Sequence, residues 1–206
     1  MDLYYSPLAC SLASRITVYE ADAQDKVSLH RVDTKAKRTA DGADYLQINP
    51  KGLVPALRTD AGDVLTENAA ILPFLADQFP EAGLAPQGGI ERYRLSQWLS
   101  FVGSELHKTV FTPLLSQTAD DGAKAFAKAA APSRLAYLDA HLSGREFLLD
   151  RFSVADAYLT AVLNWARFIG MDLSAYPAVT AYIARVSARP AVARAMEEEM
   201  GLFQAA

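Results

Sequence analysis

The sequence predicts a small α/β domain followed by an all-helical domain. Within residues 1–80, short apolar runs alternate with segments of helical periodicity, in the order β-α-β-α-β-β-α. A segment rich in proline and glycine follows at 81–88, and beyond it amphipathic helical patterns replace the strand signals. We therefore expect one domain at 1–80, a linker at 81–88 and a second domain at 89–206.

Composition and charge limit the classes of function. The chain has 206 residues, of which 51% are hydrophobic and 21% charged, as expected of a packed globular protein. A formal net charge of -4 argues against a nucleic-acid partner, which would favour a basic face. Charged residues interrupt every apolar segment, so we expect no membrane span, and no cysteine or histidine cluster predicts a metal.

The first turn carries the only cysteine, Cys10. Asp2 to Tyr5 is predicted to be a strand, Pro7 ends it, and 11–21 has helical periodicity. Cys10 then stands at a helix start, where partial positive charge favours a thiolate. It equally fits a small buried apolar position, and both interpretations stay open on these residues alone. A single thiol is compatible with the cytoplasm, and residues 1–5 lack the pattern of a secretory signal.

The next elements of the first half are short. Residues 27–32 alternate as a half-buried strand does, and a short helix around 45–48 ends in the turn-rich cluster at 49–52. Pro55 lies inside the strand-like run 53–57. An ordinary trans bond is the default there, with an edge, a bulge or a cis turn as the alternatives.

The α/β half closes with a short strand and a helix. Val64 and Leu65 are predicted to form the strand, and the helix runs to Phe79. Thr66 is its candidate N-cap, and backbone N–H groups at that end are suited to bind a carboxylate.

Helices are expected throughout the second half. A long amphipathic helix is predicted at 90–115, ended or bent by Pro113, and a second at 123–142, with a possible break at Pro132. The strongly apolar segment 154–169 should be the central buried helix.

Three further signals mark helix starts in this half. Ser153 and Asp156 have the spacing of a capping box before the buried helix. Pro177 and Pro190 each predict the first turn of a further helix.

Six segments in both halves of the chain form a set of motifs. They are Leu3-Tyr4-Tyr5-x-Pro7-x-Ala9-Cys10-Ser11-Leu12, Asn49-Pro50-Lys51-Gly52-x-Val54-Pro55-Ala56-Leu57, Thr66-Glu67-Asn68-x-Ala70-Ile71, Trp98-Leu99, Glu105-Leu106-His107-Lys108 and Phe152-Ser153-Val154-Ala155-Asp156-Ala157-Tyr158. Together these motifs resemble those of the cytosolic glutathione transferases, specifically the bacterial beta class, and their order and spacing across the whole chain make the resemblance specific.

The resemblance implies a thioredoxin-like first domain, a helical second domain and a cytoplasmic homodimer with a role in detoxification. It implies glutathione as co-substrate, no metal, a small electrophile as second substrate, and no nucleic-acid or membrane partner. It also implies a cis bond between Val54 and Pro55, so that the backbone of Val54 pairs with the cysteinyl part of glutathione like an added strand.

The resemblance also assigns site residues. The implied catalytic residues are Cys10, His107, Lys108, Ser11 and Tyr5, of which Tyr5 is expected to be supporting or simply packed. The implied glutathione-binding residues are Cys10, Lys37, Lys51, Val54, Pro55, Glu67, Asn68, Ser100, Ser104 and Glu105, with Lys35 a weaker candidate than Lys37. Glu67 would take the γ-glutamyl ammonium, and N–H groups near Asn68 its carboxylate.

Three positions depart from the class pattern. Leu8 replaces the usual glycine, Asn68 a common serine and Ser100 a frequent asparagine. These departures bear on the preference for the second substrate, whose pocket we expect to be lined by Leu8, Phe111 and Trp165. His30 and His141 have no constellation around them and are expected on the surface.

Three functional hypotheses follow. The first is conjugation, in which donors from Cys10, Ser11, the helix start and His107 or Lys108 stabilise a glutathione thiolate that attacks an electrophilic carbon. The second is thiol–disulfide, peroxidase or reductase chemistry through a mixed disulfide on Cys10. The third is a non-catalytic ligand-binding protein of the same fold.

Overall fold

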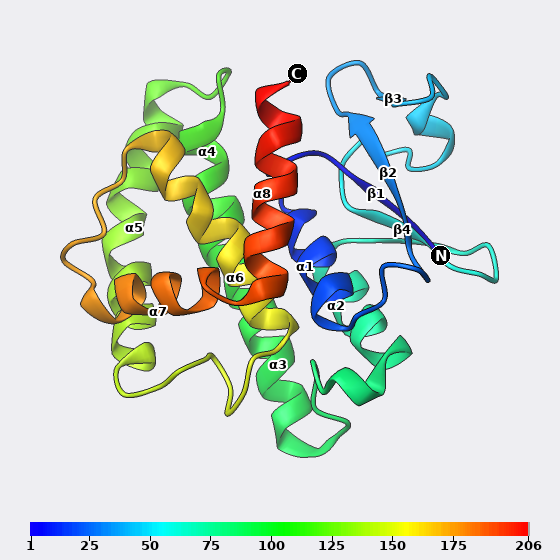
Figure 1. The fold of residues 1–206 in the computed structure, drawn as a ribbon. Coiled ribbons are helices and arrows are strands. Elements are labelled where there is room, and N and C mark those ends of the chain that lie inside the picture. Colours follow the sequence, from blue (N-terminus) through cyan, green and yellow to red (C-terminus); the bar gives the residue numbers. More distant parts are fainter. Residues whose placement is uncertain (206) are drawn as a thin grey trace.

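A five-stranded mixed sheet forms the N-terminal part of the chain (Figure 1). The structure is a computed structural model that describes residues 1–205. The strand order is β3-β2-β1-β4-β5, with β1 parallel to β2 and the other neighbours antiparallel. The strands are β1 (Asp2–Tyr5), β2 (Ser28–Asp33), β3 (Arg38–Thr39), β4 (Ala56–Arg58) and β5 (Val64–Thr66).

The helices on this sheet differ in detail from the predicted ones. They are α1 (Leu12–Glu20), the 3-10 turns η1 (Tyr45–Gln47) and η2 (Pro80–Ala82), and α2 (Asn68–Gln78). The predicted N-cap is wrong, because Thr66 is the last residue of β5 and Glu67 stands at the cap of α2. The strand β3 was not predicted, since two residues are too short to show alternation.

The second half is helical, as predicted. Its elements are α3 (Gly89–Phe101), the π-helical stretch η3 (Val102–Phe111), α4 (Thr112–Leu115), α5 (Asp121–Leu142), α6 (Val154–Leu163), the 3-10 stretch η4 (Asn164–Ile169), α7 (Pro177–Ser187) and α8 (Pro190–Gln204). The predicted long helix is therefore continuous from α3 to α4, but its middle has π geometry. Pro177 and Pro190 begin α7 and α8, which confirms both predicted starts.

The possible break at Pro132 is wrong, because α5 runs through that residue. Proline removes one helical hydrogen bond and crowds the preceding turn. The preceding alanines are strong helix formers, and the buried side chains of Ala131 and Leu135 anchor both sides of the proline in the core.

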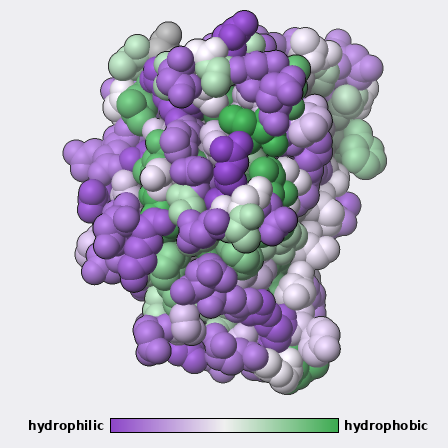
Figure 2. All heavy atoms as spheres, turned by 90° about the vertical axis from the view of Figure 1, so that its right-hand side faces the viewer, coloured by the Kyte–Doolittle hydropathy of each residue, from purple (hydrophilic) through white to green (hydrophobic). Residues whose placement is uncertain are grey.

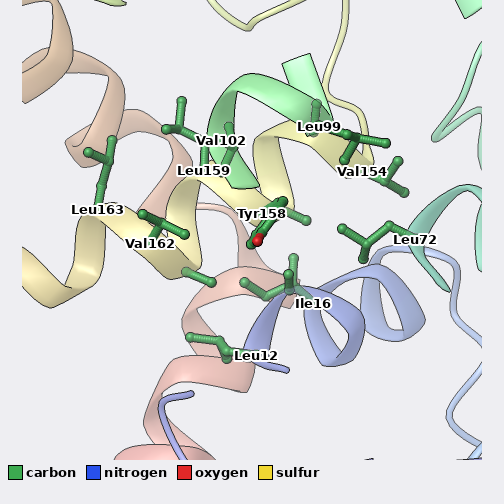
Figure 3. Close-up of a cluster of buried hydrophobic side chains, with 14 of the residues drawn as sticks. Leu12, Ile16, Leu72, Leu99, Val102, Val154, Tyr158, Leu159, Val162 and Leu163 are labelled. Carbon is green, nitrogen blue, oxygen red and sulfur yellow. The ribbon is translucent and has the colours of Figure 1, made fainter. Parts of the chain in front are cut away.

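The two halves share one apolar core. Leu12 and Ile16 of α1 and Leu72 of α2 lie against α6 in Figure 3, and all three side chains are buried. A fully buried leucine or isoleucine side chain contributes about 1.5–3 kcal/mol. The sheet half is thus packed onto the helical half through α1 and α6. The division of the chain into two domains joined by a linker at 81–88 stays a prediction.

The capping box before α6 is confirmed. The Asp156 carboxylate accepts hydrogen bonds from the backbone N–H and the hydroxyl of Ser153, both at 2.9 Å. It also accepts one from the Leu148 N–H at 2.9 Å and one from the Tyr182 hydroxyl at 3.0 Å. Because Asp156 is fully buried, these donors fix the start of the central helix.

The molecular surface on the side of the sheet is largely hydrophilic, with hydrophobic residues showing between the hydrophilic ones (Figure 2). None of the helices within residues 1–205 has the length and apolarity that crossing a bilayer requires.

Candidate active site

A cleft of about 320 Å³ lies between the sheet half and the α3–η3 helix. Most of the residues expected in the site line it. These are Cys10, Lys51, Val54, Pro55, Glu67, Asn68, Ser100, Ser104, His107 and Lys108. On the helical side the lining residues recur about every four positions along α3 and η3, so one face of this helix forms the wall.

Backbone groups before β4 form the opposite wall. The bond between Val54 and Pro55 is cis, which confirms the expectation from the resemblance. The carbonyl of Leu53 accepts hydrogen bonds from the Tyr45 hydroxyl at 2.8 Å and the Asn49 side-chain amide at 2.7 Å. These bonds hold the chain so that Val54 borders the cleft.

The sulfur of Cys10 lies at this wall. Its Sγ donates to the Val54 carbonyl oxygen at 3.2 Å, and the residue is half-buried. Burial raises the pKa of the Cys10 thiol to about 11, although the nearby Lys108 lowers it. Of the two interpretations that the sequence leaves open, the raised pKa favours a protonated thiol over a thiolate in the free protein. The helix begins only at Leu12, and desolvation outweighs the charge of Lys108.

Ser11 and Tyr5 are buried, and neither lines the cleft. The Ser11 hydroxyl accepts from the Ser6 N–H at 3.1 Å and donates to the Ser6 carbonyl at 3.2 Å. The Tyr5 ring is buried, with the Arg15 guanidinium 5.3 Å from its centre. Ser11 thus closes the turn that carries Cys10, whereas Tyr5 is a packed residue.

His107 faces the cleft from η3 and contacts Tyr158 of α6. Its Nδ1 lies 2.7 Å from the Tyr158 hydroxyl, and its ring packs edge-on to Trp165 at 4.9 Å between centroids. Burial, with the charge of Lys108, lowers the pKa of His107 to about 4. The imidazole is therefore neutral near pH 7.

Tyr158 is a lining residue that the sequence did not assign to the site. In the sequence, Tyr158 is part of the matching segment at the start of the buried helix and has no predicted role in the site. In Figure 3 it lies in the middle of the apolar cluster, and its hydroxyl reaches the cleft beside Gly103, where an added Cβ would lie 3.5 Å from that oxygen. Burial raises the pKa of the Tyr158 phenol, so it keeps its proton.

The N-terminal end of α2 supplies charged and polar groups. Glu67 has a φ of 71° and pairs with Lys51, and the hydrogen bond from Lys51 is the main reason that the pKa of Glu67 is lowered. The side-chain amide of Asn68 donates to the Cys10 carbonyl at 3.1 Å. Its buried Oδ1 has no hydrogen-bond partner among residues 1–205.

Three residues that were expected to contact glutathione do not line the cleft. Lys37 donates its Nζ to the Gly52 carbonyl at 2.9 Å, behind the loop, and Lys35 lies on a separate hollow. Glu105 pairs with Arg134 of α5 at 3.0 Å. Of the three candidate lysines, Lys51 alone lines the cleft.

Comparison with known proteins identifies the family. The family model for the N-terminal domain of glutathione S-transferase matches residues 9–78, and that for the C-terminal domain matches residues 104–190. The chain is 40% identical over 201 residues to glutathione S-transferase GstA of Escherichia coli O157:H7, covering 97% of this chain and 98% of that protein. The chain belongs to the glutathione S-transferase family.

Solved glutathione S-transferases share its fold over nearly the whole length. A sphingomonad glutathione S-transferase complexed with glutathione has 46% identity and a TM-score of 0.91, covering 97% of this chain and 98% of that chain. A bacterial beta-class glutathione S-transferase from Sphingomonas chungbukensis has 45% identity and the same TM-score of 0.91, with 97% and 98% coverage. These structures confirm the resemblance to the beta class.

A second hollow lies on the other side of the Cys10 turn in this glutathione S-transferase. It measures about 320 Å³ and is lined by Pro7, Leu8, Ala9, Leu115, Trp165, Phe168 and Phe203. Of the three residues expected to line the second-substrate pocket, Leu8 and Trp165 line this hollow. Phe111 does not, because it is fully buried behind Trp165, with ring centroids 6.0 Å apart.

The two remaining histidines differ in their surroundings. His30 is partly exposed, as expected, with its Nε2 3.1 Å from Asp2. His141 is not a simple surface residue, because its ring packs against Trp98 at 4.3 Å and its Nε2 lies 2.9 Å from the Leu148 carbonyl. Within residues 1–205, no group of three or more potential ligands is placed to hold a metal ion.

Proposed function

We propose that the protein conjugates the thiolate of glutathione to small apolar electrophiles. The arrangement that carries this proposal is the cleft in which Cys10, the Val54 backbone, Glu67 and His107 converge. A relative 46% identical to this chain was solved with glutathione bound. The apolar hollow beyond the Cys10 turn supplies a place for the electrophile.

Each part of glutathione finds a complementary group in the cleft. The cysteinyl backbone pairs with Val54 as an added strand, which displaces the Cys10 thiol from the Val54 carbonyl. The γ-glutamyl ammonium binds Glu67, and the carboxylate binds N–H groups at the start of α2. Lys51, released from Glu67, takes the glycyl carboxylate.

The chemistry requires a sulfur anion at neutral pH. A free thiol has a pKa of about 8.5, and each unit by which it falls corresponds to about 1.4 kcal/mol in favour of the thiolate. The neutral His107 donates an N–H to the sulfur, while the charge of Lys108 acts at longer range. The proton leaves to solvent, the sulfur forms a bond to the electrophilic carbon, and the leaving group departs with the electron pair of its bond.

Redox chemistry through Cys10 is the second candidate, favoured by the position of the sulfur in the same cleft. In that reaction a Cys10 thiolate attacks a disulfide that contains glutathione, and the other thiol leaves. The raised pKa of Cys10 makes this attack slow at neutral pH. The purely ligand-binding hypothesis is disfavoured because charged and hydrogen-bonding groups converge on the cleft.

We further propose a cytoplasmic homodimer that acts in detoxification. The single cysteine fits a reducing compartment. Ser100 and Ser104 lie at the exposed rim of the cleft, where a second copy of the chain has access to the bound tripeptide. The role of Glu105 in glutathione contacts stays a prediction for that assembly.

Calorimetry combined with kinetics tests the proposal. We expect saturable binding of glutathione to the wild-type protein and glutathione-dependent turnover of 1-chloro-2,4-dinitrobenzene. Glu67→Gln should weaken glutathione binding about tenfold through loss of a charge pair, whereas Glu81→Gln, on the linker, should not. Cys10→Ala should abolish thiol transfer and leave conjugation measurable. A titration with glutathione that shows neither heat nor saturation would refute both enzyme hypotheses.

A further inference from the structure

The π-helical stretch η3 carries one wall of the cleft on one face and part of the core on another. Its residues that line the cleft are Gly103, Ser104, His107 and Lys108. Its aliphatic side chains buried in the core are Val102, Leu106 and Val110. Any change in the winding of η3 would therefore move His107 and Lys108 relative to the sulfur of Cys10.

The π winding keeps the lining residues on one line. Along an α-helix, a step of four positions overshoots a full turn by about 40°. A π-helix closes its hydrogen bonds over five residues instead of four, so each of its turns holds more residues and reverses that drift. Pairs of lining residues follow one another in four-residue steps from α3 into η3: Leu99 with Ser100, Gly103 with Ser104, and His107 with Lys108. The combination of α and π winding therefore leaves all of these pairs on the cleft side.

Two threonine hydroxyls favour this winding. The Thr109 hydroxyl donates to the Ser104 carbonyl at 2.8 Å. The Thr112 hydroxyl donates to the His107 carbonyl at 2.9 Å, and the backbone N–H of Thr112 bonds to the same oxygen. Each of these bonds reaches five residues back, whereas a threonine hydroxyl in an α-helix reaches the carbonyl three or four residues back. Both hydroxyls are thus satisfied by the π winding.

Pro113 weakens the competing α winding. It is the second residue of α4 and follows η3 almost directly. Proline has no N–H, so it cannot donate to the Thr109 carbonyl four residues back, and its ring crowds that oxygen. The turn before Pro113 therefore loses one of the hydrogen bonds that would otherwise favour an α-helix.

We propose that Thr109 and Thr112 are positioning residues, which fix the π winding of η3 and thereby orient His107 and Lys108 toward the thiol of glutathione. Neither threonine lines the cleft. Each acts through the backbone carbonyl of a residue that does, Ser104 or His107. This deepens the proposed conjugation and rests on it, because the action of His107 and Lys108 on the sulfur is part of that function.

Thr109→Val combined with Thr112→Val tests the winding directly. Valine keeps the shape of threonine without the hydroxyl, and the two positions are half-buried and exposed, so the fold should be retained. The four-residue helix α4 ends before a non-helical segment and can absorb the rotation. A crystal structure of the double variant should show the amide of residue 112 bonded to the Lys108 carbonyl, as in an α-helix. A bond that still reaches the His107 carbonyl would overturn the proposal.

Kinetics separate a positioning role from a purely structural one. The double valine variant should lower kcat for 1-chloro-2,4-dinitrobenzene about fivefold and leave the KM for glutathione nearly unchanged, because the opposite wall of the cleft is untouched. Thr109→Ser combined with Thr112→Ser keeps both hydroxyls and should restore kcat. An unchanged kcat in a double valine variant whose winding has changed would refute the positioning role.

Thr180→Val is the matched control. The Thr180 hydroxyl donates to the Tyr176 carbonyl at 3.1 Å, four residues back in α7, and Thr180 does not line the cleft. The control removes the same group from an exposed helical position, so kcat and the winding of η3 should equal those of the wild-type protein. A loss of kcat as large as in the double valine variant would contradict an effect specific to η3.

Alkylation of Cys10 tests the winding without any turnover. Lys108 lowers the pKa of the Cys10 thiol, so displacement of Lys108 in the double valine variant should slow the reaction with iodoacetamide about twofold at about pH 9. A rate equal to that of the wild-type protein would show that Lys108 has not moved and would contradict the proposal. If the wild-type protein conjugates no electrophile but the variant shows the changed winding and the slower alkylation, the proposed function fails and the role of the two threonines in the winding stands.

Discussion

The backbone nitrogen of Leu8 lies 2.7 Å from a carboxylate oxygen of Glu199, although the two residues are 191 positions apart. Leu8 has a φ of 58°, and its carbonyl accepts a hydrogen bond from the Trp165 indole at 2.8 Å. Glycine adopts this left-handed conformation readily, which explains why the class pattern has glycine there. In this chain, α8 and η4 hold a leucine in the strained turn before Cys10.

The buried Glu199 makes the stability of this turn dependent on pH. Burial raises the pKa of Glu199 to about 7, opposed by the Leu8 N–H and the nearby Arg15. Because this pKa lies above the ordinary value, the folded state binds the proton more tightly than the unfolded state. The stabilisation is fully present below about pH 4.5 and is lost as the pH rises through about 7. Relative to Glu199→Gln, the wild-type melting temperature should fall between about pH 5 and 8.

Glu197→Gln is the matched control for this prediction, because Glu197 is exposed on the same helix. Its melting temperature should follow that of the wild-type protein across the pH range. Parallel profiles for the wild-type protein and Glu199→Gln would contradict the role assigned to the buried carboxyl.

The structural features that can be predicted from the sequence are those that depend on local signals and on the order of the motifs. The start of α6 is readable because Ser153 and Asp156 stand three positions apart before an apolar run. The π geometry of η3 has no such signature. In the sequence, residues 102–111 show only the amphipathic pattern that an α-helix also gives.

Other site features depend on packing between distant segments. The Tyr158 hydroxyl enters the site because α6 crosses η3, and sequence spacing does not show which side of a buried helix borders a cleft. The raised pKa of Cys10 is a balance between burial and the charge of Lys108, and that balance is set by the folded structure. Ser11 likewise is buried and bonds to Ser6.

The Cys10 thiol should alkylate slowly in the free protein. With its pKa raised to about 11, the thiolate fraction rises about tenfold for each pH unit between about pH 7 and 10. The iodoacetamide rate, followed by mass spectrometry, should increase accordingly without a plateau. Lys108→Met should lower the rate, because Lys108 favours the thiolate. A rate that is already constant above about pH 7 would disprove the assignment.

Tyr158→Phe should affect turnover more than glutathione binding. The Tyr158 hydroxyl lies 2.7 Å from His107 Nδ1, and we expect it to donate to that nitrogen, so that the proton of the neutral imidazole is held on Nε2. Loss of this bond should lower kcat about fivefold, equivalent to about 1 kcal/mol, with little change in the KM for glutathione. Nitrogen NMR shifts should show an Nε2–H tautomer in the wild-type protein and a mixture in the variant. A wild-type Nδ1–H tautomer would rule out this positioning role.

Asp156→Ala should destabilise the whole molecule and leave the chemistry of the folded fraction intact. The substitution leaves the N–H groups of Leu148 and Ser153 buried without their acceptor, at a total cost of about 3 kcal/mol. Urea unfolding should show a lower midpoint with an unchanged slope. Asp156→Asn keeps one acceptor oxygen and should cost about half as much, whereas Asp150→Ala, at an exposed position before the capping box, should cost almost nothing.

Because α6 joins both halves of the core, loss of structure should appear at one urea concentration by tryptophan fluorescence and by circular dichroism. Two separated transitions would show that the two halves of the chain unfold independently. The Ser153–Asp156 capping box would then stabilise only the helical half.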